Sequence, residues 1–217
     1  MTVFVAALLV FSAIVGVLTR NSYTQAIADA YNNSDAFLVL PHEYYGDDME
    51  DGIIANLNSA DIVVRVKKAG KTIYEYQSMK CLLRAVEVYH GDISPGDEFL
   101  FYQSDYFAYH ANGVVAYFNH SYFNPIESDC EYIVFANKRT FHPEYQKILS
   151  NDVYVFADRV VSWFRVEFSK PEPIDVIDIL DGKVKYVDIR NDEFNCISYE
   201  QRDFINTIKK KIMETFT

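Results

Sequence analysis

Aromatic side chains gather between Ser104 and Asp129, and they are the residues of this chain best suited to binding another molecule. Tyrosine and phenylalanine rings present large flat faces for sugar rings, and they are frequent hot spots in contacts between proteins. A connection this long inside a compact domain is usually functional or partly structured. We therefore expect a binding surface for a protein or a glycan, and the expected contact residues are Tyr106, Phe107, Tyr109, His110, Tyr117 and Tyr122. The alternative is that these rings cover an open end of a β-barrel.

Residue types that commonly bind metal ions or cofactors are scattered along the sequence. Of the five histidines, only His110 and His120 fall in one predicted loop, where they could meet. The stretch Asp47–Asn58 partly resembles a calcium loop, but Met49 stands at its third position and Asn58 replaces the bidentate carboxylate. We expect an acidic linker there, no metal site and no cofactor.

No catalytic motif stands out in the sequence. Glycine-rich phosphate loops, H-E-x-x-H and G-x-S-x-G are all absent. Trp163 has strand-like neighbours, which favour a place in the core. We therefore expect that the chain is not an enzyme; the alternative is a hydrolase whose site is assembled from residues far apart in the sequence.

Three cysteines, Cys81, Cys130 and Cys196, match no zinc or redox spacing. We expect free thiols, with a Cys81–Cys130 disulfide as the alternative. The sequence also holds two glycosylation sequons, at Asn32 and Asn119.

The first nineteen residues carry no charge and are almost wholly apolar. A helix of that length roughly matches the ~30 Å hydrocarbon core of a bilayer. Val3–Leu18 is either a retained signal anchor or the apolar region of a signal peptide cleaved after Ala26-Ile27-Ala28. Arg20 alone would place the following residues in the cytoplasm, but the body lacks the basic excess of a cytoplasmic flank. A buried core helix is the remaining alternative.

The composition indicates one ordinary globular domain behind this segment. Half of the 217 residues are hydrophobic and 24% are charged, with a net charge of −11. Because nucleic-acid affinity comes mainly from lysine and arginine, we expect no nucleic-acid partner. The same charge disfavours docking on anionic lipid and suits an exported protein.

The elements expected to position these residues are mostly strands. β-rich runs bounded by turn residues occur at 60–66, 81–89, 98–103 and 131–136, with further runs between 151 and 168. Short helices are expected at 22–31 and 53–58. We expect a membrane or signal segment at 1–20, a linker at 21–58, a barrel at 59–169, and a final unit at 170–217 that packs on the barrel.

The final unit is expected to contain a hairpin and a helix. Asp181-Gly182 between two β-rich runs is typical of a two-residue hairpin turn. Ser198 and Gln201 then form a capping box for a helix. Its apolar residues recur every four positions, at Phe204, Ile208, Ile212 and Phe216, and they predict a face packed on the core.

The order of segments between Ser59 and Phe135 resembles a loose group of exported proteins of unknown function from Gram-positive bacteria. The matching pieces are a strand ending Val88-Tyr89-His90-Gly91-Asp92, the turn Gly96-Asp97 and the later run E-Y-I-V-F. This resemblance implies an OB-type barrel similar to that of the tissue inhibitors of metalloproteinases. Those inhibitors act through an N-terminal cysteine, whereas the first cysteine here is Cys81, so we do not expect their mechanism.

Together these observations predict a mainly β, α+β protein: a five-stranded OB-like barrel with short N-terminal helices, a hairpin and a C-terminal helix. We expect a secreted or membrane-anchored extracytoplasmic binding module, with residues 3–18 contacting the membrane. The alternative is an accessory domain of a cell-envelope assembly that uses the N-terminal helix as its interface.

Overall fold

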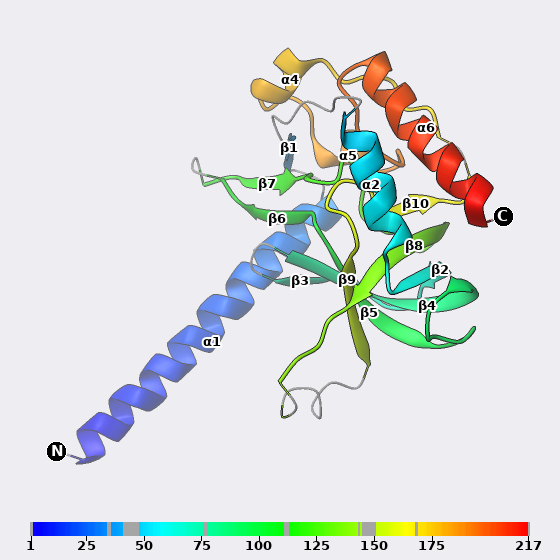
Figure 1. Ribbon diagram of the computed structural model, residues 1–217. Coiled ribbons are helices and arrows are strands. Elements are labelled where there is room, and N and C mark those ends of the chain that lie inside the picture. The colour runs from blue at the N-terminus through cyan, green and yellow to red at the C-terminus, as the bar shows by residue number, and fades with distance from the viewer. Residues whose placement is uncertain are drawn as a thin grey trace.

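The computed structural model contains a long N-terminal helix and a body built on two β-sheets (Figure 1). It describes residues 2–33, 36–40, 48–75, 78–110, 113–142, 144, 151–167 and 169–216. The mainly β class, the OB-like barrel and the helices at both ends agree with the sequence prediction.

Helix α1 (Thr2–Asn33) is one continuous helix of 32 residues. It projects away from the body in Figure 1, and residues 5–22 bury nothing against the rest of the chain. Near its other end, Ile27 is only 1% exposed and belongs to the interior of the body. The separate helix expected at 22–31 is therefore the inner end of α1, and residues 5–22 are not a buried core helix.

Five strands close into the predicted barrel: β2 (Ile62–Lys68), β4 (Ser78–His90), β5 (Glu98–Gln103), β9 (Asp152–Phe156) and β8 (Glu131–Lys138). Strands β5 and β9 run parallel, and all other neighbours in the ring are antiparallel. The β8–β9 pairing closes the ring. Outside the ring, strand β3 (Ile73–Glu75) pairs with β4, and β10 (Trp163–Arg165) pairs with β8.

Two glycines shape the connection between β4 and β5. Gly96 lies in the predicted turn with φ +95°, where Ser94 donates its backbone N–H to the Asp97 carboxylate at 2.8 Å. Gly91 has φ +104°, and a Cβ built there would lie 2.3 Å from the carbonyl oxygen of Asp61. Only glycine fits this close approach to the start of β2.

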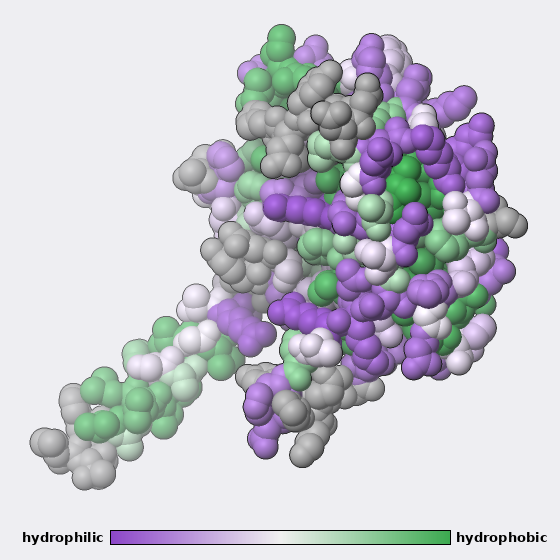
Figure 2. Space-filling model, in the orientation of Figure 1, coloured by the Kyte–Doolittle hydropathy of each residue, from purple (hydrophilic) through white to green (hydrophobic). Residues whose placement is uncertain are grey.

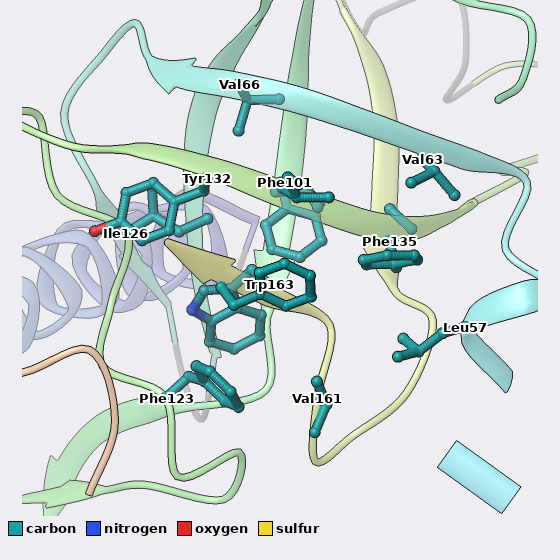
Figure 3. Packing of buried hydrophobic residues seen from close by; sticks show 14 of the residues in the cluster. Leu57, Val63, Val66, Phe101, Phe123, Ile126, Tyr132, Phe135, Val161 and Trp163 are labelled. Carbon is teal, nitrogen blue, oxygen red and sulfur yellow. The ribbon is translucent and has the colours of Figure 1, made fainter. Parts of the chain in front are cut away.

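The main core fills the barrel and the space beneath helix α2 (Asp48–Asn58) (Figure 3). Trp163 is fully buried, and its ring meets that of Phe101 edge to face at 5.8 Å between centroids. Its indole N–H donates to the carbonyl oxygen of Asn124 at 3.1 Å, which satisfies its polar atom. Ile53 and Leu57 bring α2 into the same core, and the short helix expected at 53–58 is the second half of α2.

The second sheet is formed by β1 (Phe37–Val39), β7 (Val115–Phe118) and β6 (Tyr106–Tyr109), in that order. The long connection expected after Ser104 is thus largely a β-hairpin. This sheet covers a smaller core that is separate from the main one, and its buried members are Ile27, Ala36, Leu38, Met79, Phe107, Tyr117, Tyr186 and Ile189.

The hairpin predicted around Asp181-Gly182 is wrong. Two short helices occupy this stretch, α4 (Val176–Leu180) and α5 (Tyr186–Ile189). Asp175 caps α4 by accepting the backbone N–H of Ile177 at 2.8 Å. Gly182, with φ +66°, follows the C-cap residue Asp181, a position where helices favour a left-handed glycine.

The C-terminal helix α6 (Tyr199–Phe216) forms as predicted and packs on the main core through Ile205, Ile208 and Ile212. The Ser198 hydroxyl accepts the backbone N–H of Gln201 at 3.1 Å, as a capping box requires. The Gln201 side chain accepts the N–H of Ile197 at 2.7 Å, one residue earlier than the motif predicts.

Candidate functional site

The six expected contact residues do not form one exposed surface. Phe107, Tyr117 and Tyr122 are each no more than 1% exposed. The rings of Phe107 and Tyr117 stack at 4.8 Å within the smaller core, and both contact the ring of Tyr186. Burial therefore removes these three side chains from reach of a ligand.

The other three expected residues remain accessible but lie apart. Tyr106 is half-buried at the start of β6, whereas Tyr109 and His110 are exposed at its far end. The His110 ring packs edge to face on Phe37 at 5.3 Å. His110 and His120 lie at opposite ends of the β6–β7 hairpin, so the meeting that the sequence allowed does not occur. Within the described residues no group of three potential ligands could hold a metal ion.

A groove of about 870 Å³ lies where the ends of several barrel strands meet the β6–β7 hairpin. Strand β5 contributes Tyr102 and Gln103, and β6 contributes Tyr106. The remaining wall comes from the ends of β4 and β8, from β9, and from the turns after β7 and β9; its residues are Ser78, Ser104, His120, Lys138, Arg139, Thr140, Val155, Phe156 and Arg159.

Strand pairing brings these distant residues together. Tyr102 of β5 lies opposite Val155 of β9, and Lys138 of β8 lies opposite Tyr154 of the same strand. The three barrel strands therefore end side by side. The groove includes the start of β4, the end of β5 and the start of the β8–β9 connection. β4 and β5 are the second and third strands of the barrel, and OB-type barrels commonly bind ligands on these strands and on the neighbouring loops.

A buried carboxylate holds the wall of the groove next to His120. Asp105 Oδ1 accepts the backbone N–H groups of His120 at 2.7 Å and Ser121 at 2.8 Å. Asp105 Oδ2 accepts the Ser121 hydroxyl at 2.7 Å, the Asn119 amide at 3.2 Å and the Tyr117 hydroxyl at 3.3 Å. These bonds tie the turn after β7 to the β5–β6 corner.

The surroundings of Asp105 set its protonation. Burial raises the pKa of this carboxyl group to about 6, while the hydrogen bonds from Ser121, His120 and Tyr117 oppose that rise. Tyr122, two residues after His120, adopts a left-handed backbone with φ 61° although it is not glycine. Its carbonyl oxygen accepts the backbone N–H of Asn195 at 2.6 Å, which holds this turn against the segment before α6.

The turn that carries Arg159 is also fixed internally. Asp158 Oδ1 accepts the backbone N–H groups of Val160 at 2.8 Å and Val161 at 3.1 Å. The other carboxylate oxygen of Asp158 accepts the side-chain amide of Asn56 at 2.8 Å, and the Ser104 hydroxyl donates to the Arg159 carbonyl at 3.2 Å. The backbone beneath the Arg159 side chain is therefore held from α2 and from β5.

Four basic side chains line the groove, and its described lining contains no carboxylate. Lys138 pairs with Asp152 at 2.6 Å, and this hydrogen bond raises the pKa of the lysine. The Arg139 guanidinium lies over the rings of Phe141 at 5.1 Å and Tyr102 at 5.9 Å. Arg159 lies 3.4 Å from Nδ1 of His120. This arrangement suits noncovalent binding by polar, cationic and aromatic groups.

The sequence prediction missed Arg139 and Arg159. They are twenty positions apart in a chain with an acidic excess, and no motif links them. Both arginines follow strand ends, so a pairing assigned between the two preceding strands is the signal that could have found them.

The cysteines and one sequon also have defined places. Cys81 and Cys196 are buried, Cys130 is half-buried, and all three are free thiols. The Asn119 side chain is fully buried and donates to the Phe123 carbonyl at 2.9 Å. Asn119 is therefore out of reach of a glycosylating enzyme in the folded protein.

No protein-family model matches the sequence, and a search of curated proteins also found no match. The predicted resemblance to exported proteins with an inhibitor-like barrel therefore stays a prediction.

Proposed function

We propose that this chain is a membrane-anchored binding module whose body lies on the extracytoplasmic side and binds a protein or glycan through the groove. One observation carries the anchored part of the proposal. Helix α1 exposes its apolar outer residues on every side, and the same unbroken helix places Ile27 in the protein interior.

The outer part of α1 has the dimensions and surface of a bilayer span. Residues 5–22 form a helix that is long and apolar enough to cross a membrane, and its 18 residues extend about 27 Å. Leu9, Phe11 and Leu18 are each more than 60% exposed, and Figure 2 shows the projecting helix largely in the colour of hydrophobic residues. A hydrocarbon environment removes this surface from water.

The inner end of α1 supports retention over cleavage. Ile27 packs with Leu38, Met79 and Tyr186 in the smaller core. Cleavage before Asp29 would remove Ile27 and leave a void beside strands β3 and β6, the strands that α1 contacts. A core isoleucine typically contributes ~2–5 kcal/mol relative to alanine, so the folded body favours the uncleaved chain.

Two features support a binding role outside the cell. The groove gathers cationic, aromatic and hydroxyl side chains from separate elements, as ligand sites do. The net charge of −11 keeps an exported domain soluble and away from anionic lipid.

The anchored part is tested by expressing the full chain in a bacterial host. The expected results are an intact mass that includes residues 1–28, extraction from membranes only by detergent, and digestion of the body by protease added to spheroplasts. A soluble protein that begins at Asp29 would overturn the anchor, and protection of the body in intact spheroplasts would overturn its extracytoplasmic placement.

A pair of variants separates the two ends of α1. Ile27→Ala should lower the free energy of unfolding by ~2–5 kcal/mol, whereas Val17→Ala, on the exposed span, should leave it unchanged. Urea unfolding in detergent, followed by fluorescence of the single tryptophan, Trp163, measures both. Equal stability of the two variants would show that Ile27 is dispensable to the fold.

A further inference from the structure

We propose that the groove binds a saccharide that carries a carboxylate or phosphate group, and that Arg139 and Arg159 hold this group. The inference rests on the proposed binding function and names its ligand class. It begins from charge: the chain has 31 acidic residues against 20 lysines and arginines, yet the described groove lining has one lysine, two arginines and His120, and no acidic residue.

Neither groove arginine has an acidic partner among the described residues. Across the residues that the structure describes, no carboxylate lies within ion-pair distance of the guanidinium of Arg139 or Arg159. In contrast, other cations of the barrel are paired, as Arg65 is with Glu131 and Arg84 is with Glu98 at 2.6 Å. Two carboxylates near the groove are already engaged.

Those two carboxylates are Asp152 and Glu75. Asp152 pairs with Lys138 at 2.6 Å, and Glu75 pairs with Lys80 at 2.5 Å. Each lysine offsets the charge of its partner, so the arginines supply the remaining positive charge of the groove. An anionic ligand group is the species that this charge attracts.

Apart from one Arg159 nitrogen that contacts His120, neither guanidinium group donates a side-chain hydrogen bond to the described residues. Contact of the Arg139 guanidinium with the faces of Tyr102 and Phe141 restrains its plane, and such contacts leave the in-plane N–H groups available. The backbone at Arg159 is fixed by the Asp158 turn. Planar guanidinium groups bind carboxylate and phosphate oxygens through paired hydrogen bonds.

The form of the groove favours a saccharide over a peptide. Strands β5, β8 and β9 are each paired on both sides, and β6, an edge strand of the second sheet, contributes only its first residue, Tyr106, so the groove offers little backbone edge to an added peptide strand. The half-buried rings of Tyr102 and Tyr106, with the hydroxyl groups of Ser78 and Thr140, are the aromatic and polar groups that contact sugars. The acidic body would repel a long polyanion outside the groove, which disfavours nucleic acid.

The test uses the full chain in detergent and an array of oligosaccharides. Each anionic member, bearing one uronate carboxylate or one phosphate, is paired with its neutral parent; a tetraglutamate peptide and a single-stranded DNA oligonucleotide complete the set. We expect binding of anionic saccharides, with at least tenfold preference over the neutral parents and weakening at high salt. The carboxylate and phosphate members distinguish the two possible anionic groups.

Arg139→Gln and Arg159→Gln should each weaken that binding about tenfold. Arg190→Gln, an exposed arginine after α5 and outside the groove lining, is the matched control and should bind as the original chain does. Because both groove arginines are exposed, their replacement should leave the unfolding midpoint unchanged, which separates lost binding from lost folding.

Three results would overturn the ligand class. Equal binding of neutral and anionic saccharides, or tighter binding of the peptide or the DNA that depends on the arginines, would leave the groove as a binding site with another ligand. Failure of every probe to bind would overturn the saccharide ligand and would leave the proposed binding function with a protein ligand only. None of these results bears on the anchor, which the membrane fractionation tests separately.

Discussion

The ammonium group of Lys209 donates to both carboxylate oxygens of Glu193, at 2.8 and 2.9 Å, and each side chain is only 1% exposed. A third hydrogen bond joins the lysine to the carbonyl oxygen of Glu167 at 2.6 Å, so all three ammonium protons are used. Burial raises the pKa of Glu193 and lowers the pKa of Lys209, while the mutual attraction of the pair opposes both shifts. This pair connects α6 to the segment before it.

Removal of one partner should destabilise the fold strongly. Lys209→Met leaves the Glu193 carboxylate buried without its counter-charge, and we expect the free energy of unfolding to fall by about 3–5 kcal/mol. The double variant Lys209→Met, Glu193→Gln should recover a large part of this loss because no charge remains buried. Urea unfolding monitored at Trp163 measures each variant, and a double variant less stable than Lys209→Met would contradict the argument.

Asp105 should make stability depend on pH between about 4 and 6. Its folded pKa of about 6 lies above the ordinary value, so the folded state binds the proton more tightly than the unfolded state. Its stabilising contribution is therefore complete below pH 4 and falls as the pH rises through 6, by about 3 kcal/mol for a shift of this size.

Asp105→Asn tests this dependence. The difference in unfolding free energy between the original chain and the variant should be largest near pH 4 and should shrink towards pH 7. Val17→Ala, an exposed position without a titratable group, serves as the control and should show a constant difference. A difference that grows with pH would mean that the hydrogen bonds to Asp105 favour the ionised carboxylate.

The three thiols should differ in reactivity. Burial raises the pKa of Cys81 to about 12 and that of Cys196 to about 11, so both are protonated and shielded at pH 8. A disulfide reagent should therefore modify Cys130 first in the folded protein, and all three thiols after denaturation. A mass two hydrogens lower, with Cys196 as the only reactive thiol in denaturant, would establish the alternative Cys81–Cys130 bridge.

Substitution of Gly91 and Gly96 distinguishes the cost of a strained backbone dihedral from the cost of a steric clash. Both have positive φ, but a Cβ at Gly96 meets nothing within 4 Å, whereas one at Gly91 meets the Asp61 backbone. Gly96→Ala should cost about 1 kcal/mol for the dihedral alone. Gly91→Ala should cost at least about 2 kcal/mol more, because β2 must move; equal unfolding midpoints for the two variants would refute the steric argument.

The barrel could be read from the sequence because its signals are local. Strand β5 has the predicted bounds, 98–103, since alternation and the turn before it depend only on neighbouring residues. The segment around Asp181-Gly182 failed for the opposite reason. The same dipeptide suits a hairpin turn and a helix end, and the Asp175 cap decided between them.

The site was harder to predict because it depends on which way side chains point and on distant pairings. In the β6–β7 hairpin, Phe107 lies opposite Tyr117 in the interior, while Tyr106 lies opposite Phe118 on the other face. A count of aromatic residues cannot distinguish these faces. Arg139 and Arg159 meet at one groove only because β8 and β9 pair at the closure of the barrel.

Helix α1 contains no glycine or proline from Val17 to Asn33, and within that stretch its side chains pass from solvent to the interior at Ile27. The outer and inner parts of α1 are therefore joined by continuous helix, without a flexible hinge. A change in the tilt of its outer half would shift Ile27 within the smaller core. It would also shift β6, which α1 contacts and whose first residue lines the groove. A force applied to the outer part of α1 would therefore be transmitted to Tyr106 in the groove.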